Sequence, residues 1–211
     1  MESSKIAEYL LKIKAVRLSV KEPFTWSSGW KSPIYCDNRL SLSYPEVRNY
    51  IKAAFVSMIR EKFPEAEAIA GVATGAIALG ALVADAMDLP MVYIRSKAKG
   101  HGMQNLVEGK VEPSAKYVVI EDLVSTGGSS VKAVKALQES GAKVLATIAI
   151  FSYGFPQATE AFEQTGTPYY SLTNLVELLQ KAQDFDYLQA SEQSLIFEWQ
   201  KDPEKWRKTP F

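Results

Sequence analysis

Apolar positions along the chain follow two spacings, one typical of strands and one typical of helices. Short runs rich in β-branched residues predict buried strands at residues 68–72, 91–94, 117–120 and 143–151. A shorter run at 169–171 predicts an edge strand. Between these runs, apolar residues three or four positions apart predict helices at about residues 4–15, 45–63, 77–87, 131–137, 155–164 and 174–182.

This order of elements predicts the fold class. Strands that alternate with helices form a mainly parallel sheet with helices on both faces, which is an α/β fold. Ser4 and Thr173 stand where helical patterns begin and are expected to be N-caps. Apolar spacing in residues 188–206 predicts terminal amphipathic helices. With 211 residues and no internal repeat or linker, residues 1–211 are expected to form one domain.

The segment from Phe24 to Arg39 has no helical period. It is rich in aromatic residues, contains a glycine and is interrupted by a proline, which predicts a short β-hairpin. Aromatic side chains on such a hairpin can pack against a flat ring. On periodicity alone, a surface hairpin packed on itself is the favoured interpretation.

The stretch from Tyr117 to Ser130 combines a strand, an acidic pair and a loop of small residues. Glu121 and Asp122 follow the apolar run, and residues 125–129 bring hydroxyl groups and glycines to the expected start of a helix. Free N–H groups at a helix N-terminus favour anions. The carboxylates can accept hydrogen bonds from sugar hydroxyls or help to hold a Mg²⁺ that phosphates also bind. The stretch predicts a sugar-phosphate site, and an ordinary strand–helix connection is the alternative.

Composition and motifs exclude several classes of function. The 24 basic and 24 acidic residues balance, which argues against a broad nucleic-acid-binding surface. There is no P-loop, and residues 100–105 lack the last glycine of the dinucleotide fingerprint. His101 is the only histidine, so a histidine metal site or a Ser-His-Asp hydrolase is poorly supported. The single Cys36, the lack of a leader and the lack of a long apolar run indicate a cytoplasmic protein.

A basic, glycine-rich segment follows the strand predicted at 91–94. It carries Arg95, Lys97, Lys99 and His101, has no apolar face, and is expected to form an irregular loop as far as about Gly109. Such a loop can close over a polyphosphate, neutralise its charge and exclude water. A solvated basic loop is the alternative.

Several of these segments resemble one protein family. Val118 to Ser129 resembles the phosphoribosyl pyrophosphate (PRPP) signature of the type I phosphoribosyltransferases. Thr25 to Arg39 is similar to the N-terminal hood of the orotate phosphoribosyltransferases within that family, a hood of about residues 20–40 completed by both terminal segments. Residues 72–75 resemble the family's pyrophosphate loop, and residues 95–102 resemble its catalytic loop.

The resemblance implies a reaction, a cofactor and an assembly. The reaction joins the ribose 5-phosphate of PRPP to orotate, releases pyrophosphate and forms orotidine 5′-monophosphate in pyrimidine synthesis. The cofactor is Mg²⁺ carried by PRPP, near Glu121 and Asp122, and the assembly is a homodimer that shares the basic loop across subunits. The catalytic residues that it implies are Arg95, Lys99 and His101. The orotate-binding residues that it implies are Lys31 and Tyr35, and Ser125 is expected to bind orotate with them. The PRPP-binding residues that it implies are Arg95, Lys99, His101, Glu121, Asp122, Leu123, Val124, Ser125, Thr126, Gly127, Gly128 and Ser129.

Three positions depart from the family pattern. Many members carry a lysine where this chain has Ser27 and where it has Gly75, so the loop at Gly75 is expected to act through its backbone. Many orotate enzymes also place an arginine after the strand that ends at residue 151, and here Ser152-Tyr153-Gly154-Phe155 follows. Ser125, main-chain groups or the hood are then expected to recognise orotate. A purine phosphoribosyltransferase and a PRPP-sensing regulator without catalysis remain as alternatives.

Overall fold

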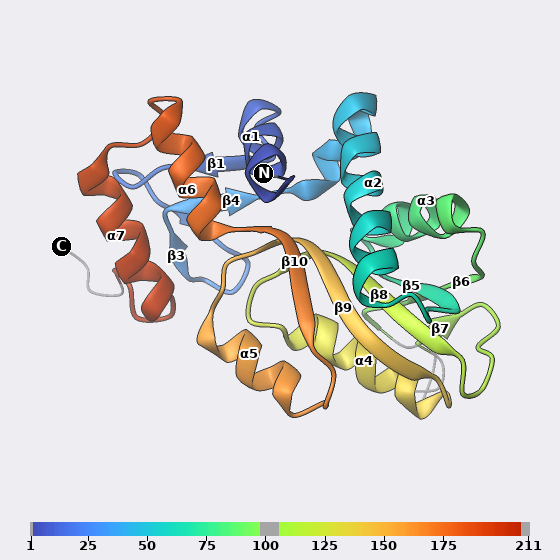
Figure 1. Ribbon diagram of the computed structural model, residues 1–211. Coiled ribbons are helices and arrows are strands. Elements are labelled where there is room, and N and C mark those ends of the chain that lie inside the picture. The colour runs from blue at the N-terminus through green and yellow to red at the C-terminus, as the bar shows by residue number, and fades with distance from the viewer. Residues whose placement is uncertain (1, 98–105, 208–211) are drawn as a thin grey trace.

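The computed structural model describes residues 2–97 and 106–207 (Figure 1). The strands are β1 Val16–Leu18, β2 Phe24–Thr25, β3 Lys31–Ser32, β4 Ile34–Cys36, β5 Ala68–Val72, β6 Met91–Ile94, β7 Val107–Glu108, β8 Lys116–Val124, β9 Lys143–Ser152 and β10 Tyr169–Asn174. The helices are α1 Glu2–Lys12, the 3-10 helix η1 Asn38–Ser43, α2 Pro45–Lys62, α3 Ile77–Met87, α4 Gly128–Glu139, α5 Pro156–Glu163, α6 Leu175–Asp184 and α7 Ala190–Lys201.

A six-stranded sheet forms the centre of the molecule, in the order β10-β9-β8-β5-β6-β7. The strands from β10 to β6 pair in parallel, and only the short β7 is antiparallel, to β6. The prediction of a mainly parallel α/β fold is confirmed. Because β5 and β8 are neighbours in the sheet, the turns that follow them lie at the same edge, where ligands bind in open parallel sheets.

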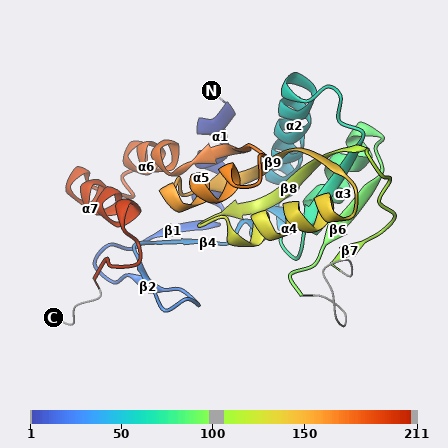
Figure 2. The same cartoon turned by 90° about the horizontal axis from the view of Figure 1, so that it is seen from below.

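Helices cover both faces of this sheet, as Figures 1 and 2 show for α1 to α3 on one side and for α4 and α5 on the other. The alternation of side chains along β8 explains the two layers. Val118 and Ile120 belong to the apolar core that contains residues of α1, α2 and α3. Tyr117 and Val119 belong to the core that contains residues of α4 and α5. Both faces of the sheet are therefore buried from water, as is typical of parallel sheets.

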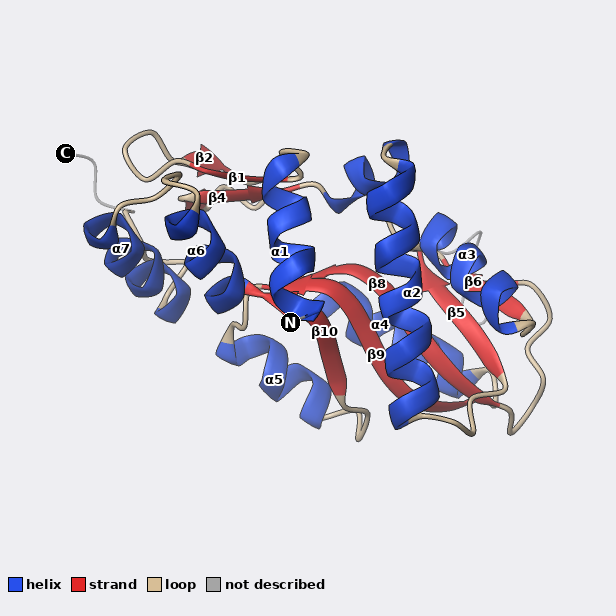
Figure 3. Cartoon of the chain, turned by 45° about the horizontal axis from the view of Figure 1, so that its top comes forward, coloured by secondary structure: helices blue, strands red, loops and turns tan. Residues whose placement is uncertain are grey.

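The predicted hairpin lies beside the sheet and forms the hood. β2 pairs with β3 in antiparallel orientation, and β4 pairs with β1. Figures 1 and 3 show α7, from the other end of the chain, next to these strands. Trp26 and Trp199 meet edge to face with ring centroids 5.7 Å apart, and Arg207 Nη1 donates a hydrogen bond to the carbonyl of Val20 at 2.9 Å. The hood is thus completed by the C-terminal segment.

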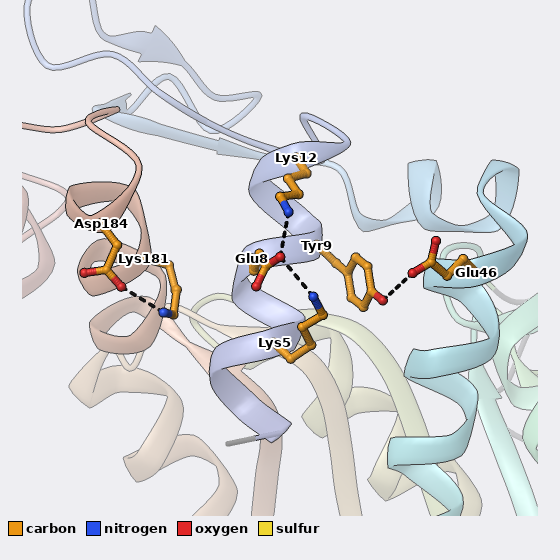
Figure 4. Close-up of polar contacts among 7 residues, drawn as sticks. All are labelled: Lys5, Glu8, Tyr9, Lys12, Glu46, Lys181 and Asp184. Carbon is orange, nitrogen blue, oxygen red and sulfur yellow. Dashed lines mark hydrogen bonds and ion pairs between the residues drawn. The ribbon is translucent and has the colours of Figure 1, made fainter.

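Helix α1 lies between α2 and α6 and joins them to the hood (Figure 4). The hydroxyl of Tyr9 donates a hydrogen bond of 2.6 Å to Glu46 on α2, which raises the pKa of Tyr9 to about 12. Lys12 and Lys5 both contact the Glu8 carboxylate and lower its pKa. None of the described helices has both the length and the apolar character needed to cross a bilayer.

Four details differ from the predictions. α1 begins at Glu2, so Ser4 lies in its first turn and is not its cap. The cap of α6 is Asn174 and not Thr173, since the Asn174 side chain accepts from the N–H of Glu177 at 3.1 Å. β8 continues through the acidic pair to Val124, since β9 is long enough to pair with it there. The end of the predicted irregular loop forms β7.

The buried face of α1 should be essential for stability. Leu10 is fully buried in the core beneath α1, so Leu10→Ala should lower the free energy of unfolding by about 2–5 kcal/mol. Val176 on α6 is 58% exposed, and Val176→Ala is the control, with an expected change of about 0.5 kcal/mol or less. Urea unfolding followed by circular dichroism measures both. Equal losses in the two variants would contradict the assigned packing.

Candidate active site

Two adjoining cavities lie at the carboxyl ends of the central strands. The inner pocket, about 300 Å³, is lined by residues 72–75 and by Glu121 to Leu123 and Ser125 to Ser129. The hood pocket, about 580 Å³, is lined by residues of the hood and by Tyr153. The two share Leu123, Ser125 and Thr126, so they form one continuous cleft. A larger cavity of about 850 Å³ lies beside β10 and contains none of the predicted site residues.

The floor of the inner pocket is the turn between β8 and α4. Gly127 caps α4 with φ of 83°, a left-handed conformation that glycine adopts without strain. A Cβ on Gly127 would also lie 3.3 Å from the Cα of Ala158. α4 starts at Gly128, and its first N–H groups have no partners within the helix. The partial positive charge at this helix end makes the floor a favourable place for a phosphate.

Asp122 lies between two other segments of the site. A Cβ on Gly75 would overlap the Asp122 carboxylate, so the absence of a side chain at Gly75 lets that carboxylate pack directly on the backbone after β5. From the other side, Asn38 Nδ2 donates a 2.6 Å hydrogen bond to the main-chain carbonyl of Asp122. Asn38 is 1% exposed and follows β4, so this bond ties the hood to the acidic pair.

Glu121 is in a different environment from Asp122. Its carboxyl is 4% exposed and accepts hydrogen bonds from Ser130 Oγ at 2.8 Å and from the N–H of Asp122 at 3.0 Å. Burial, followed by the neighbouring Asp122 carboxyl, raises the pKa of Glu121 well above its ordinary value. Asp122 is only half-buried. The pair therefore offers the pocket one exposed carboxylate, with a buried carboxyl group behind it.

The hood pocket is aromatic and uncharged. Trp26, Trp30 and Tyr35 line it, with Ser125 and Thr126 at its junction with the inner pocket. The Cys36 thiol also lines it and donates to Asn38 Oδ1 at 3.2 Å, and burial raises the pKa of this thiol so that it stays neutral. A planar heterocycle fits between such aromatic walls.

The structure brings most of the predicted residues together. Tyr35 and Ser125 line the hood pocket, but Lys31 does not, because its Nζ donates to Thr25 Oγ1 across the hairpin at 2.8 Å. Val124 is fully buried beneath the loop and lines neither pocket. The other residues predicted from Glu121 to Ser129 all line the inner pocket.

The basic loop is only partly described. Arg95 lies just after β6, where its Nη1 is 3.4 Å from Glu108 Oε1, and it lines neither pocket. Lys99 and His101 lie outside the described residues. Their predicted roles therefore stay predictions.

Sequence reasoning missed several residues of the cleft. Trp26, Trp30 and Cys36 belong to the predicted hairpin but were not assigned to a site. Tyr153 was noted only as part of a segment that lacks the arginine found in many orotate enzymes. The role of Asn38 could not be predicted from the sequence, because it depends on a contact with a residue 84 positions away.

Known proteins share both the sequence and the fold. The model of the phosphoribosyl transferase domain matches residues 42–177. The orotate phosphoribosyltransferase of Cytophaga hutchinsonii is 52% identical over 206 residues, which cover 98% of this chain and 99% of that protein. The enzyme of the same name from Porphyromonas gingivalis is 51% identical over 95% of this chain and 96% of its own length.

A solved structure agrees with these relatives. The crystal structure of orotate phosphoribosyltransferase from Aeropyrum pernix superposes with a TM-score of 0.75 at 29% identity, over 84% of this chain and 98% of that one. The domain match contains every residue that lines the inner pocket, whereas the hood strands precede it. The two orotate phosphoribosyltransferases align with nearly the whole of this chain at about half identity, so their similarity includes the hood as well. The chain belongs to the orotate phosphoribosyltransferase family of the phosphoribosyltransferases.

Proposed function

We propose that this protein transfers the 5-phosphoribosyl group of PRPP to orotate, forming orotidine 5′-monophosphate and pyrophosphate. The observation that carries the proposal is the continuous cleft, in which an anion-binding turn opens into an aromatic pocket at Ser125 and Thr126. A sugar phosphate in the inner pocket and a flat base in the hood pocket would meet at that junction.

The inner pocket suits PRPP. The loop from Ser125 to Ser129 offers hydroxyl and N–H donors to the 5′-phosphate at the start of α4. The half-buried Asp122 carboxylate can accept hydrogen bonds from the ribose hydroxyls. Glu121 was expected to share that role, and we propose that it mainly supports Asp122 through its bond to Ser130. The backbone of residues 73–75, opposite the loop, is available to the pyrophosphate.

Mg²⁺ fits this arrangement. The described residues contain no group of three or more His, Cys, Asp or Glu side chains that could hold a metal on their own. Mg²⁺ commonly binds through one or two carboxylates together with substrate phosphates, and Asp122 can supply such a carboxylate. When bound, the ion would neutralise charge on the diphosphate.

The chemistry follows from charge. As the bond between ribose C1 and pyrophosphate lengthens, the sugar becomes cationic and the leaving group gains negative charge. The Asp122 carboxylate favours positive charge on the sugar, and N–H donors favour negative charge on the phosphates. The aromatic hood excludes water from the base, so that a ring nitrogen of orotate is positioned to attack C1.

We further propose that the basic loop acts in a homodimer, on the site of the neighbouring subunit. Arg95 starts this loop and lines neither pocket of its own chain, which supports action elsewhere. Its side chain contacts Glu108 on β7, and Lys132 Nζ on α4 donates to the carbonyl of Ser96 at 3.1 Å, so the start of the loop is fixed to both elements. Arg95, Lys99 and His101 would then neutralise the leaving pyrophosphate. We also propose a cytoplasmic location, supported by the free thiol of Cys36.

The proposed reaction is tested by pyrophosphate release. The purified protein with PRPP and Mg²⁺ should release pyrophosphate when orotate is added and should release little with adenine or hypoxanthine. Turnover with a purine instead would identify a purine enzyme. PRPP binding without turnover of any base would identify a regulator.

Gly75→Ala should damage the PRPP site selectively. The added methyl group must displace the Asp122 carboxylate, so kcat/KM for PRPP should fall about tenfold or more while the KM for orotate changes little. Ala86→Ser, at an exposed position of helix α3, which follows this turn, is the control and should behave like wild type. Steady-state kinetics with each substrate varied separately measure both. An unchanged kcat/KM for PRPP would show that the Asp122 position is unimportant.

Loop sharing predicts complementation between two inactive variants. Lys99→Ala should cut kcat about a hundredfold, far more than it raises the KM for PRPP, and Asp122→Asn should disable the inner pocket. In a mixed dimer, the intact loop of the Asp122→Asn chain would serve the intact pocket of the Lys99→Ala chain. Random co-assembly should then restore about a quarter of wild-type activity. Activity no higher than that of the separate variants would contradict loop sharing.

A further inference from the structure

The hood pocket would have to hold an anionic base without a charged side chain. Orotate carries a carboxylate, yet the residues that line this pocket are aromatic, aliphatic, hydroxyl-bearing or a thiol. Lys31, the cation that the sequence predicted to lie near the base, is exposed, and its side chain donates a hydrogen bond to Thr25 instead. If the proposed function holds, the oxygens of the base must bind to neutral donors.

Tyr153 has the most constrained side chain in this pocket. It follows the last residue of β9 and is 1% exposed. Its ring stacks on Phe155 with centroids 5.3 Å apart and an interplanar angle of 18°, and it lies 5.2 Å from Trp26. Trp199 packs against it edge to face at 5.5 Å. A ring enclosed in this way has one orientation, so its hydroxyl occupies one place.

Within residues 2–97 and 106–207 that hydroxyl makes no hydrogen bond, although nearly the whole side chain is buried. The polar groups that act on it electrostatically are Cys36 and Tyr35, which both line the hood pocket. Burial raises the pKa of Tyr153 well above its ordinary value, so the hydroxyl keeps its proton and can donate it in a hydrogen bond. The Tyr153 oxygen is not among the fully enclosed polar atoms that lack a partner, so it keeps some access from outside, and a donor without a protein partner at a pocket wall is suited to an acceptor on a ligand.

We propose that Tyr153 Oη donates a hydrogen bond to an acceptor oxygen of orotate and that Tyr153 is a specificity-determining residue of the base site. The hydroxyl would supply a fixed neutral donor at the end of β9, where this chain has no cation.

Helix α7 holds Tyr153 in this position. Gln200 Nε2 donates a 2.6 Å hydrogen bond to the main-chain carbonyl of Tyr153, and Trp199, the preceding residue, contacts the ring. The next residue, Gly154, has φ of 69°, and a Cβ there would lie 3.1 Å from Gln200 Nε2. Gln200 therefore sits close against this turn and acts as a positioning residue, which links the C-terminal helix to base recognition.

Tyr153→Phe tests the donor, because it removes one oxygen and keeps the ring and its packing. The KM for orotate should rise about tenfold, while the KM for PRPP and the Tm stay close to wild type. Tyr169→Phe is the matched control, since that ring stacks on Phe162 away from the cleft, and it should change neither KM. An unchanged KM for orotate in Tyr153→Phe would overturn the inference. Wild-type turnover of orotate in the same assay would show that the proposed function still holds.

A double-mutant cycle tests the role of Gln200. Gln200→Ala should raise the KM for orotate several-fold in the wild-type background, without changing the KM for PRPP. In the Tyr153→Phe background it should add little, because the hydroxyl that Gln200 positions is already gone. An equal increase in both backgrounds would show that Gln200 only stabilises the fold and would overturn its positioning role.

Discussion

The pairing of β5 with β8 is the constraint on which the site depends. In this register Gly71 lies beside Ile120, so the turn after β5 meets the acidic pair that continues β8. Any side chain at Gly75 would have to displace the Asp122 carboxylate, which occupies the space where a Cβ would be. Two chain segments about fifty residues apart thus form the two walls of one pocket. A shift in this register would separate them and would leave each turn as an ordinary loop.

The two pockets of the cleft differ in how much of their lining lies within the match to the phosphoribosyl transferase domain. Every residue of the inner pocket lies within the match to the phosphoribosyl transferase domain, which agrees with a common sugar-phosphate substrate. Hood residues before that match line much of the second pocket, and α7, which follows the match, packs against the rings of Trp26 and Tyr153 in its wall. Asn38 connects the two parts, because it follows the hood strand β4 and binds the carbonyl of Asp122. Movement of the hood would therefore shift the main chain at the acidic pair.

Features that depend on neighbouring residues could be predicted from the sequence, whereas features that depend on distant contacts could not. The strands at 68–72 and 91–94 were predicted correctly, and so was the start of a helix after the loop of hydroxyl groups and glycines, because their signals are local runs of residues. The end of β8 was misplaced, because the residues from Glu121 to Val124 stay in the strand through pairing with β9, which only the folded chain provides. Tyr153 was overlooked for the same reason, since its cage joins residues from the hood and from α7.

An uncharged pocket for an anionic base has a physical rationale. A buried cation without a partner would be costly whenever the site is empty, whereas neutral hydroxyl and aromatic groups lose little on desolvation. Hydrogen bonds to a charged acceptor are stronger than those between neutral groups, so neutral donors can still favour a carboxylate. Their strength depends on direction, however, and this requires donors that cannot rotate away. The cage around Tyr153 meets that requirement, and it explains why a helix from the end of the chain packs against the base pocket.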